Sequence, residues 1–391
     1  MNQSPLEGIR VADLTRVVSG PMATRILADM GAEVIKIEPP GGDFTREVLP
    51  HVDGVGAYFS QLNTGKKNLS IDLRTERGAG LLRDLVQHCD VLVENFRPGI
   101  MEKLGLAPED ALRSHPELVF CSITGYGRSG PWMDRRAYAP LVHAEAGTLE
   151  MAARRRGANP VPEVQSHGDV YPATMAANAI LAALLHRART GRGQHVDVSM
   201  AEVLAYTNEW SAVELAGGGE IEQLFGAWNS PVLQLASGVR VAVPGNPVFT
   251  FPRWIKAMQR EELAKDPRFC TADQRMRNRR ELLALLQEFV GSFDDARSLE
   301  ATLERCNLSL GEVRSVSELA DTSWARHRGL VSEVAAGVGV PAHPWISTAM
   351  RVGARSGVAR LGEHNREILT GLLGLSDQDF TALSAAGVLA G

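Results

Sequence analysis

Short apolar runs alternate with amphipathic segments through the first half of the chain, and this alternation constrains the fold more than any other feature. A short apolar run is typical of a strand, and apolar residues spaced by three or four positions are typical of a helix. Strands joined by helices form a parallel sheet that is covered on both faces. The sequence therefore predicts a Rossmann-like α/β domain, with strands at 9–14, 34–37, 91–93, 118–123 and 195–199 and helices at 21–30, 77–88 and 172–187.

The second half of the chain has a different pattern and predicts a second, smaller domain. With 391 residues, the chain exceeds the length that one hydrophobic core usually supports. The run Gly217-Gly218-Gly219 has the composition of a flexible linker. Short strands near 232–243 are then followed by amphipathic helices such as 280–289. We expect a large domain at 1–210, a linker at 211–225 and a smaller α+β domain at 226–330.

The composition excludes several classes of partner. The net charge of −5 creates no field that would attract a polyanion, so we do not expect nucleic acid to bind. No segment approaches the roughly 20 consecutive apolar residues of a membrane span, and the first residues lack a secretion signal. We therefore expect a cytoplasmic protein without a membrane partner. The four cysteines lack the spacing of metal ligands, and no metal site is predicted.

The turn after the first predicted strand argues against a dinucleotide cofactor. Residues 15–21 contain Gly20 as their one glycine, whereas the dinucleotide fingerprint needs three. The helix that begins near Pro21 still presents free backbone N–H groups and the positive end of its dipole. A phosphate-bearing ligand other than a dinucleotide therefore fits this edge of the sheet.

Basic side chains at the same edge are candidates for binding phosphates. Arg16, Arg97 and Lys103 each follow a predicted strand end, where the ligands of parallel sheets gather. Arg135-Arg136 form a further short basic cluster. A solvated surface position is the alternative for each of these side chains.

Asp169 is the carboxylate best placed for chemistry. It precedes an alanine-rich helix that is predicted to begin near Pro172, and a helix start keeps a nearby carboxylate ionised. From local sequence alone, an ordinary N-cap is the favoured interpretation of Asp169. His167 could form an acid–base pair with Asp169 if the segment between them is extended, and His143 is a further isolated histidine. Neither a Ser-His-Asp order nor a Gly-x-Ser-x-Gly motif is present.

Several segments together resemble those of a known enzyme family. They are 5–11, Gly20-Pro21, 29–38, Gly42-Asp43, Asn63 with Lys66-Lys67, 93–99, Gly168-Asp169, 190–194 and 361–364. With these segments the sequence resembles the class III coenzyme A (CoA) transferases, the family of formyl-CoA transferase and carnitine CoA-transferase. The resemblance spans nearly the whole chain, is strong through residue 200 and weakens between about 210 and 260.

The resemblance implies a fold, an activity and a set of site residues. It implies an interlocked, ring-like homodimer, in which the tail 340–391 completes the Rossmann-like large domain after a return linker at 331–345. It also implies acyl-CoA and a small carboxylic acid as substrates, without a tightly bound cofactor or a metal. Gly168-Asp169 matches the family's nucleophile, so Asp169 is expected to form a mixed anhydride and then an aspartyl-CoA thioester. By the same resemblance, CoA is expected to contact Arg16, Val17, Val18, Ser19, Leu73, Arg74, Asn95, Phe96, Arg97, Lys103, Leu104, Arg136 and Tyr138.

Two other functions stay open beside CoA transfer. The related α-methylacyl-CoA racemases use a histidine and an aspartate at the acyl α-carbon. Their Gly-His-Asp motif would fall at Ala137-Tyr138-Ala139, where it is absent. A non-catalytic CoA-binding relative is the other alternative. The glycine-rich loop that covers the nucleophile in formyl-CoA transferases has no counterpart around 238–247, which indicates a substrate other than oxalate.

Overall fold

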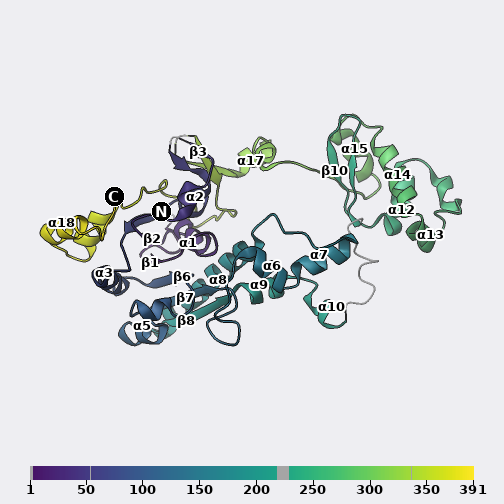
Figure 1. The fold of residues 1–391 in the computed structure, drawn as a ribbon. Helices are drawn as coiled ribbons and strands as arrows, with labels where there is room; N and C mark the ends of the chain where they lie inside the picture. The colour runs from purple at the N-terminus through teal and green to yellow at the C-terminus, as the bar shows by residue number, and fades with distance from the viewer. Residues whose placement is uncertain (1–2, 53, 218–228, 336) are drawn as a thin grey trace. The chain divides into compact units, whose positions relative to one another are not determined.

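The computed structural model describes residues 3–52, 54–217, 229–335 and 337–391 (Figure 1). The chain divides into two compact units. Unit 1 comprises Met1–Thr148, Pro162–Glu209 and Ser323–Gly391, and unit 2 comprises Leu149–Val161 and Trp210–Thr322. Part of the predicted linker at 211–225, including Gly218 and Gly219, lies outside the described residues. The predicted bounds of the domains and linkers therefore stay predictions.

A six-stranded parallel sheet forms the centre of unit 1, as the alternating sequence pattern predicts. In the order β5-β2-β1-β6-β7-β8, its strands are β5 (Lys67–Ser70), β2 (Glu33–Glu38), β1 (Arg10–Asp13), β6 (Val91–Glu94), β7 (Val119–Thr124) and β8 (Gln194–Ser199). The strand β5 was not predicted from the sequence, because Leu69 is the one apolar residue among its four.

Helices and two short hairpins complete unit 1 (Figure 1). The helices are α1 (Ser19–Asp29), η1 (Phe44–Glu47), α2 (Ala57–Asn63), α3 (Glu76–Val86), α4 (Ile100–Lys103), α5 (Pro108–Ser114), α6 (Ala139–Glu145), α8 (His167–Thr190), α9 (Met200–Thr207), α17 (Ser323–Arg328), the π-helix η4 (Glu367–Leu372) and α18 (Asp377–Ala385). The hairpins pair β3 (His51–Val52) with β4 (Val55–Gly56) and β12 (Val331–Ala335) with β13 (Val338–Pro341).

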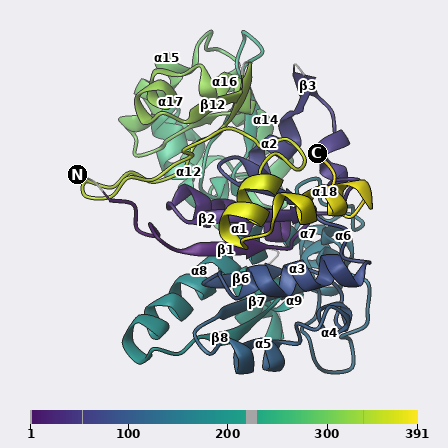
Figure 2. The same cartoon turned by 90° about the vertical axis from the view of Figure 1, so that its left-hand side faces the viewer.

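Two hydrophobic cores lie on the two faces of the sheet. One core packs α3, α5, η4 and α18 against strand residues such as Ala12 and Leu92, and Figure 2 shows α3 and α18 on that face. The other packs α1, α6, α8 and α9 against the alternate residues, such as Val11 and Val93. Among the described residues, α8 alone has the length and hydropathy of a membrane span. Ala173, Ala176 and Ala183 of α8 are buried in the second core. Burial in a protein core therefore accounts for the apolar composition of this helix.

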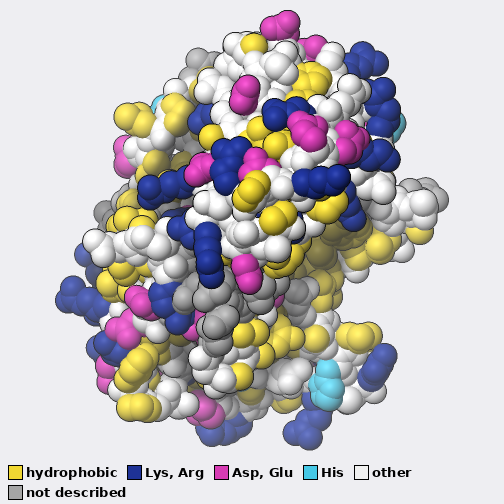
Figure 3. Space-filling view, turned by 90° about the vertical axis from the view of Figure 1, so that its right-hand side faces the viewer, with side chains coloured by type: hydrophobic (Ala, Val, Ile, Leu, Met, Phe, Trp, Pro, Cys, Tyr) yellow, Lys and Arg dark blue, Asp and Glu magenta, His cyan; other side chains and the backbone are white. Residues whose placement is uncertain are grey.

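Unit 2 is a small α+β unit with its own core, in which Trp254, Leu286 and Leu299 are fully buried. Its antiparallel sheet has the order β11-β10-β9, with β11 (Gly311–Glu312), β10 (Arg240–Ala242) and β9 (Val232–Gln234). Its helices are α7 (Thr148–Arg156), α10 (Ser211–Leu215), α12 (Pro247–Ala257), η3 (Glu261–Lys265), α13 (Ala272–Arg277), α14 (Arg279–Val290), α15 (Ala296–Glu304) and α16 (Val316–Ala320). Basic and acidic side chains are interspersed on the molecular face drawn in Figure 3, in keeping with the small net charge.

Candidate active site

The candidate site lies at the carboxyl ends of β1 and β6. These neighbouring strands form the topological switch point of the sheet, because the chain continues from β1 to β2 on one side and returns to β6 on the other. Asn95, after β6, joins the two loops that follow these strands. Its Oδ1 accepts the N–H of Arg16 at 3.0 Å, and its Nδ2 donates to the Arg16 carbonyl at 2.8 Å. The two loops are therefore held against each other.

Buried charges support the turn after β1. Val17 has a φ of 70°, a left-handed conformation that β-branched residues rarely adopt. Its N–H donates to Oδ2 of Asp43 at 3.2 Å, and this carboxylate lies 3.4 Å from the Nζ of Lys36. Lys36 also donates to the Thr15 carbonyl at 2.9 Å. Because both charged side chains are buried, their ion pair and hydrogen bonds stabilise the turn in this strained conformation.

A second buried ion pair lies beneath the start of α1. Oδ2 of Asp13 accepts from Lys66 Nζ at 3.0 Å and from Thr24 Oγ1 at 2.6 Å, and Lys66 also donates to the Pro21 carbonyl at 2.9 Å. Burial lowers the pKa of Lys66 to about 8, although Asp13 opposes this shift. Burial alone would raise the pKa of Asp13, but the charges of Lys66 and Lys36 and two threonine hydrogen bonds outweigh it and lower the pKa.

Most of the predicted CoA-binding residues line two cavities of unit 1. The larger cavity, of about 540 Å³, is lined by Arg16, Leu73, Arg74, Phe96, Lys103 and Leu104. The smaller, of about 260 Å³, is lined by Arg16, Val17, Ser19, Asn95, Phe96, Arg97, Tyr138 and Asp169. The two cavities share Arg16, Phe44 and Phe96, so they border each other. Of the predicted residues, Val18 and Arg136 line neither cavity, because Val18 is buried and Arg136 is exposed elsewhere.

Three cations around these cavities form no ion pair with any residue in the described parts of the chain. They are Arg16, Arg97 and Lys103, and the Arg16 guanidinium lies over the Phe96 ring at 5.7 Å. Arg74 differs, because it pairs with Asp72 at 2.8 Å. Cations without a protein partner at the switch point of a parallel sheet are suited to bind the phosphates of a nucleotide.

Asp169 lies within α8, which corrects the predicted helix start near Pro172. The helix begins at His167 with Ser166 as its N-cap residue, and Asp169 is the acidic residue of the first turn. The N-cap interpretation of Asp169 is wrong, because Ser166 is the N-cap residue and Pro172 lies inside the helix, not at its start. The Asp169 carboxyl is half-buried and lines the smaller cavity, and burial raises its pKa to about 6. The helix start therefore does not keep this pKa low, although the carboxylate is ionised at neutral pH.

The two histidines near Asp169 do not line either cavity. His143, on α6, is buried, and its Nε2 accepts the N–H of Gly168 at 2.7 Å. His167 stacks on Tyr171 with ring centroids 5.0 Å apart, and its Nε2 lies 2.8 Å from Oε1 of Gln165. The predicted pairing of His167 with Asp169 would need an extended segment, and the segment is helical.

Several residues that line the smaller cavity were not predicted from the sequence, among them Phe44, Met133 and Met200, whereas Arg135 was named only as part of a basic pair. The Arg135 guanidinium lies 4.3 Å from the centroid of the Trp132 ring and pairs with Glu145 at 2.8 Å. The basic pair Arg135-Arg136 pointed to this region, but local sequence does not tell which of two adjacent arginines faces a cavity.

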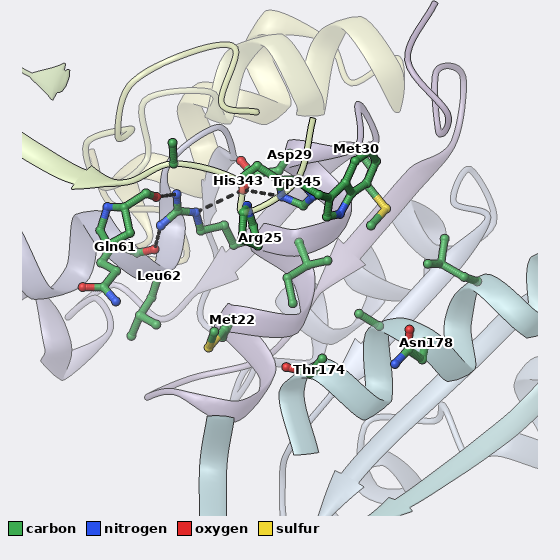
Figure 4. A pocket seen from close by; sticks show the side chains of 16 residues that line it. Met22, Arg25, Asp29, Met30, Gln61, Leu62, Thr174, Asn178, His343 and Trp345 are labelled. Carbon is green, nitrogen blue, oxygen red and sulfur yellow. Dashed lines mark hydrogen bonds and ion pairs between the residues drawn. The ribbon is translucent and has the colours of Figure 1, made fainter. Parts of the chain in front are cut away.

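A separate cavity of about 400 Å³ lies between α1, α8 and the segment 341–345 (Figure 4). At one side, the Nε of Arg25 lies 3.5 Å and the Nδ1 of His343 3.3 Å from Oδ2 of Asp29. Met22, Met30, Leu62 and Trp345 supply apolar walls. None of the predicted site residues lines this cavity, so it is distinct from the site at the switch point.

The sequence matches one protein family over most of its length. The profile of CoA-transferase family III matches residues 6–365. The chain is 32% identical over 399 residues to succinyl-CoA:glutarate CoA-transferase of Mus musculus, an alignment that covers 99% of this chain and 91% of that protein. It is 33% identical over 419 residues to formyl-CoA:oxalate CoA-transferase of Streptomyces avermitilis, with coverage of 98% and 99%.

The fold is similar to that of a solved structure. The crystal structure of a CAIB/BAIF family protein from Brucella suis aligns with a TM-score of 0.83 at 30% sequence identity. The alignment covers 95% of this chain and all of that one, so the similarity includes both units.

Proposed function

The chain belongs to CoA-transferase family III and is a CoA-transferase, and on this premise we propose that Asp169 is the nucleophile of the transfer. The observation that carries the proposal is the position of its carboxyl in the cavity that borders the larger one at Arg16, Phe44 and Phe96. An acyl-CoA has a nucleotide at one end and a thioester at the other, so it fits two cavities that border each other. We propose that the nucleotide occupies the larger cavity and that the thioester reaches Asp169.

Burial and charge support these two roles. Burial raises the pKa of Asp169 to about 6, so the carboxylate is ionised above that pH and is more basic than an exposed aspartate. Arg16, Arg97 and Lys103 are the cations proposed to bind the phosphates. Leu73 and Leu104 supply apolar surface for the adenine ring.

The proposed reaction conserves the energy of the thioester. An Asp169 oxygen attacks the thioester carbon, the carbon–sulfur bond breaks, and a mixed anhydride and the CoA thiolate form. The thiolate attacks the Asp169 carbonyl and releases the donor acid as a carboxylate, which leaves an aspartyl-CoA thioester. The acceptor carboxylate attacks this thioester and regenerates the thiolate, which then attacks the acceptor carbonyl. Acceptor-CoA is released and Asp169 is again a carboxylate. The proposed cycle consumes no proton and no nucleoside triphosphate and has no step that requires a metal.

We propose a dicarboxylic acid as one substrate. Glutarate, oxalate and the succinyl group, which appear in the names of the relatives, all derive from dicarboxylic acids. Arg135 lines the same cavity as Asp169 and supports this proposal, because its guanidinium is suited to bind a second carboxylate. We also propose that the enzyme acts in the cytoplasm as the interlocked homodimer implied by the sequence resemblance. A mass measurement on the intact protein in solution tests the dimer.

The alternative of racemisation is disfavoured by the two histidines. Acid–base chemistry at an α-carbon needs an imidazole nitrogen that faces the substrate. The Nε2 of His143 is occupied by the Gly168 N–H, and neither His143 nor His167 lines the cavity with Asp169. Exchange of an α-hydrogen for deuterium without transfer of CoA would favour the racemase.

Trapping of the thioester tests the proposed nucleophile. The protein is incubated with succinyl-CoA and then with hydroxylamine, which converts an aspartyl thioester to a hydroxamate. We expect peptide mass spectrometry to find the hydroxamate at Asp169, and we expect Asp169→Asn to lose both the adduct and the transfer of CoA to glutarate. Asp110→Asn, which changes an exposed carboxylate on α5, is the control that keeps both. Full transfer by Asp169→Asn, or a hydroxamate on another residue, would contradict the mechanism.

A further inference from the structure

The first turn of α8 depends on a hydrogen bond from another helix. The first N–H groups of a helix have no acceptor within the helix and need partners from elsewhere. The N–H of Asp169 donates to the Ser166 carbonyl at 2.8 Å, but the Ser166 side chain makes no cap hydrogen bond. The N–H of Gly168 instead donates to Nε2 of His143, on α6, at 2.7 Å. His143 therefore does for α8 what an N-cap side chain does for most helices.

Close packing fixes the position of this hydrogen bond. His143 is 1% exposed. A Cβ atom added to Gly168 would lie 3.1 Å from the Ala139 Cα and 3.2 Å from the His143 Nε2. Both distances are shorter than ordinary contacts, so α6 and the start of α8 approach as closely as a glycine allows. The backbone that carries Asp169 is thus held directly by α6.

The hydrogen bond requires an uncharged imidazole. Nε2 can accept a hydrogen bond only through its lone pair, so the proton of the neutral ring is on Nδ1. Nδ1 is buried and has no hydrogen-bond partner among the described residues. A charged ring would turn an N–H toward the N–H of Gly168. The ionisable neighbours that act on the ring are His167 on α8, with ring centroids 6.4 Å apart, and Glu163 in the preceding segment. Burial lowers the pKa of His143, His167 acts in the same direction, and Glu163 opposes them.

We propose that His143 is a positioning residue for CoA transfer, whose neutral imidazole holds the Gly168 backbone and so aims the Asp169 carboxylate. The inference rests on the proposed role of Asp169 as the nucleophile. His143 lines neither cavity, so it acts through Gly168 and not by contact with the substrate.

Two substitutions separate the hydrogen bond from packing. His143→Leu fills similar space without an acceptor, and we expect kcat to fall about tenfold, the effect of leaving one buried N–H unpaired. The KM for succinyl-CoA should change less than about twofold, because the binding surfaces are intact. His143→Gln offers a side-chain carbonyl to the Gly168 N–H and should restore most of kcat. An unchanged kcat in His143→Leu, or a His143→Gln as slow as His143→Leu, would overturn the proposal.

The pH profile gives a second readout that a structural defect would not change in the same way. Protonation of His143 should reduce kcat in addition to protonation of Asp169, so log kcat of the wild type should fall with a slope steeper than one at the acid end of its pH profile. In His143→Gln only Asp169 titrates, and the slope should approach one. Equal slopes of log kcat at acid pH in the wild type and in His143→Gln would overturn the requirement for a neutral imidazole. This comparison still decides the matter if His143→Leu fails to fold.

Two controls complete the experiment. His115→Leu removes another imidazole of unit 1, beyond α5 and away from both cavities, and should leave kcat unchanged. Asp169→Asn separates this inference from the proposed function. If Asp169→Asn is inactive and His143→Leu is fully active, only the positioning role is wrong. If Asp169→Asn is active, the proposed nucleophile is wrong.

Discussion

Replacement of Asp169 by asparagine should stabilise the protein at neutral pH while it abolishes CoA transfer. The half-buried carboxyl has a pKa of about 6, compared with 3.8 for an exposed aspartate. A carboxyl whose pKa is raised in the folded state supports folding fully below pH 3.8, and that support is lost as the pH rises through about 6. Above that pH the folded protein carries a partly desolvated charge that the amide of Asp169→Asn lacks.

The magnitude follows from the two pKa values. Their difference corresponds to about 3 kcal/mol of unfolding free energy at pH 7.5. Asp169→Asn should therefore be more stable than the wild type by about 3 kcal/mol, or roughly 4 °C in Tm for a chain of 391 residues.

Thermal unfolding of both proteins at several pH values is the assay. The Tm difference should be near zero at pH 4, should grow between about pH 4 and about pH 6, and should be constant at higher pH. Asp110→Asn removes an exposed carboxylate and should show no such dependence. A wild type that is the more stable protein at pH 7.5, or a difference that does not vary with pH, would refute this reasoning.

Two further substitutions test the cavity and its support. Arg135→Leu should raise the KM for glutarate about tenfold and leave the KM for a monocarboxylic acceptor nearly unchanged. Arg113→Leu removes a similarly ion-paired arginine on α5 and should change neither KM. Equal effects of Arg135→Leu on both acceptors would contradict the role of Arg135. Asp43→Asn leaves the buried Lys36 without its ion-pair partner and should destabilise the protein by about 3 kcal/mol in thermal melts. The same change at the exposed Asp110 should cost less than about 1 kcal/mol, and equal losses would show that the Lys36 pair does not stabilise the turn.

The sequence predicts the parallel sheet because central strands such as β6 and β7 are buried on both faces and so appear as apolar runs. It does not predict β5, since a strand with one apolar residue lacks that pattern. Most of the site residues that the family resemblance supplied line one of the two cavities, but many other lining residues were not predicted. The start of α8 was misplaced because Pro172 indicates a first helical turn, whereas the acceptor that supports the true start belongs to His143, 25 residues earlier in the chain.

Features set by contacts distant in sequence were also missed. The left-handed Val17 depends on the carboxylate of Asp43, and nothing in the local sequence of a valine indicates such a conformation. Which member of the pair Arg135-Arg136 lines the smaller cavity depends on packing around Trp132 and Glu145. Such arrangements follow from the assembled fold and not from any segment alone.

The two hydrogen bonds between the Asn95 side chain and the Arg16 backbone affect how the enzyme's specificity could be changed by design. One amide side chain engages both backbone groups of a residue in the other loop, so substitutions in either loop disturb the opposite one as well. Mutant libraries directed at these loops should therefore yield many variants that bind CoA poorly. Met133 and Met200 line the cavity of Asp169 and belong to neither of these two loops, and their flexible side chains can be exchanged for others of different size. Changes at these two positions should reshape the space proposed for the acyl group without altering the loops that are proposed to bind the nucleotide.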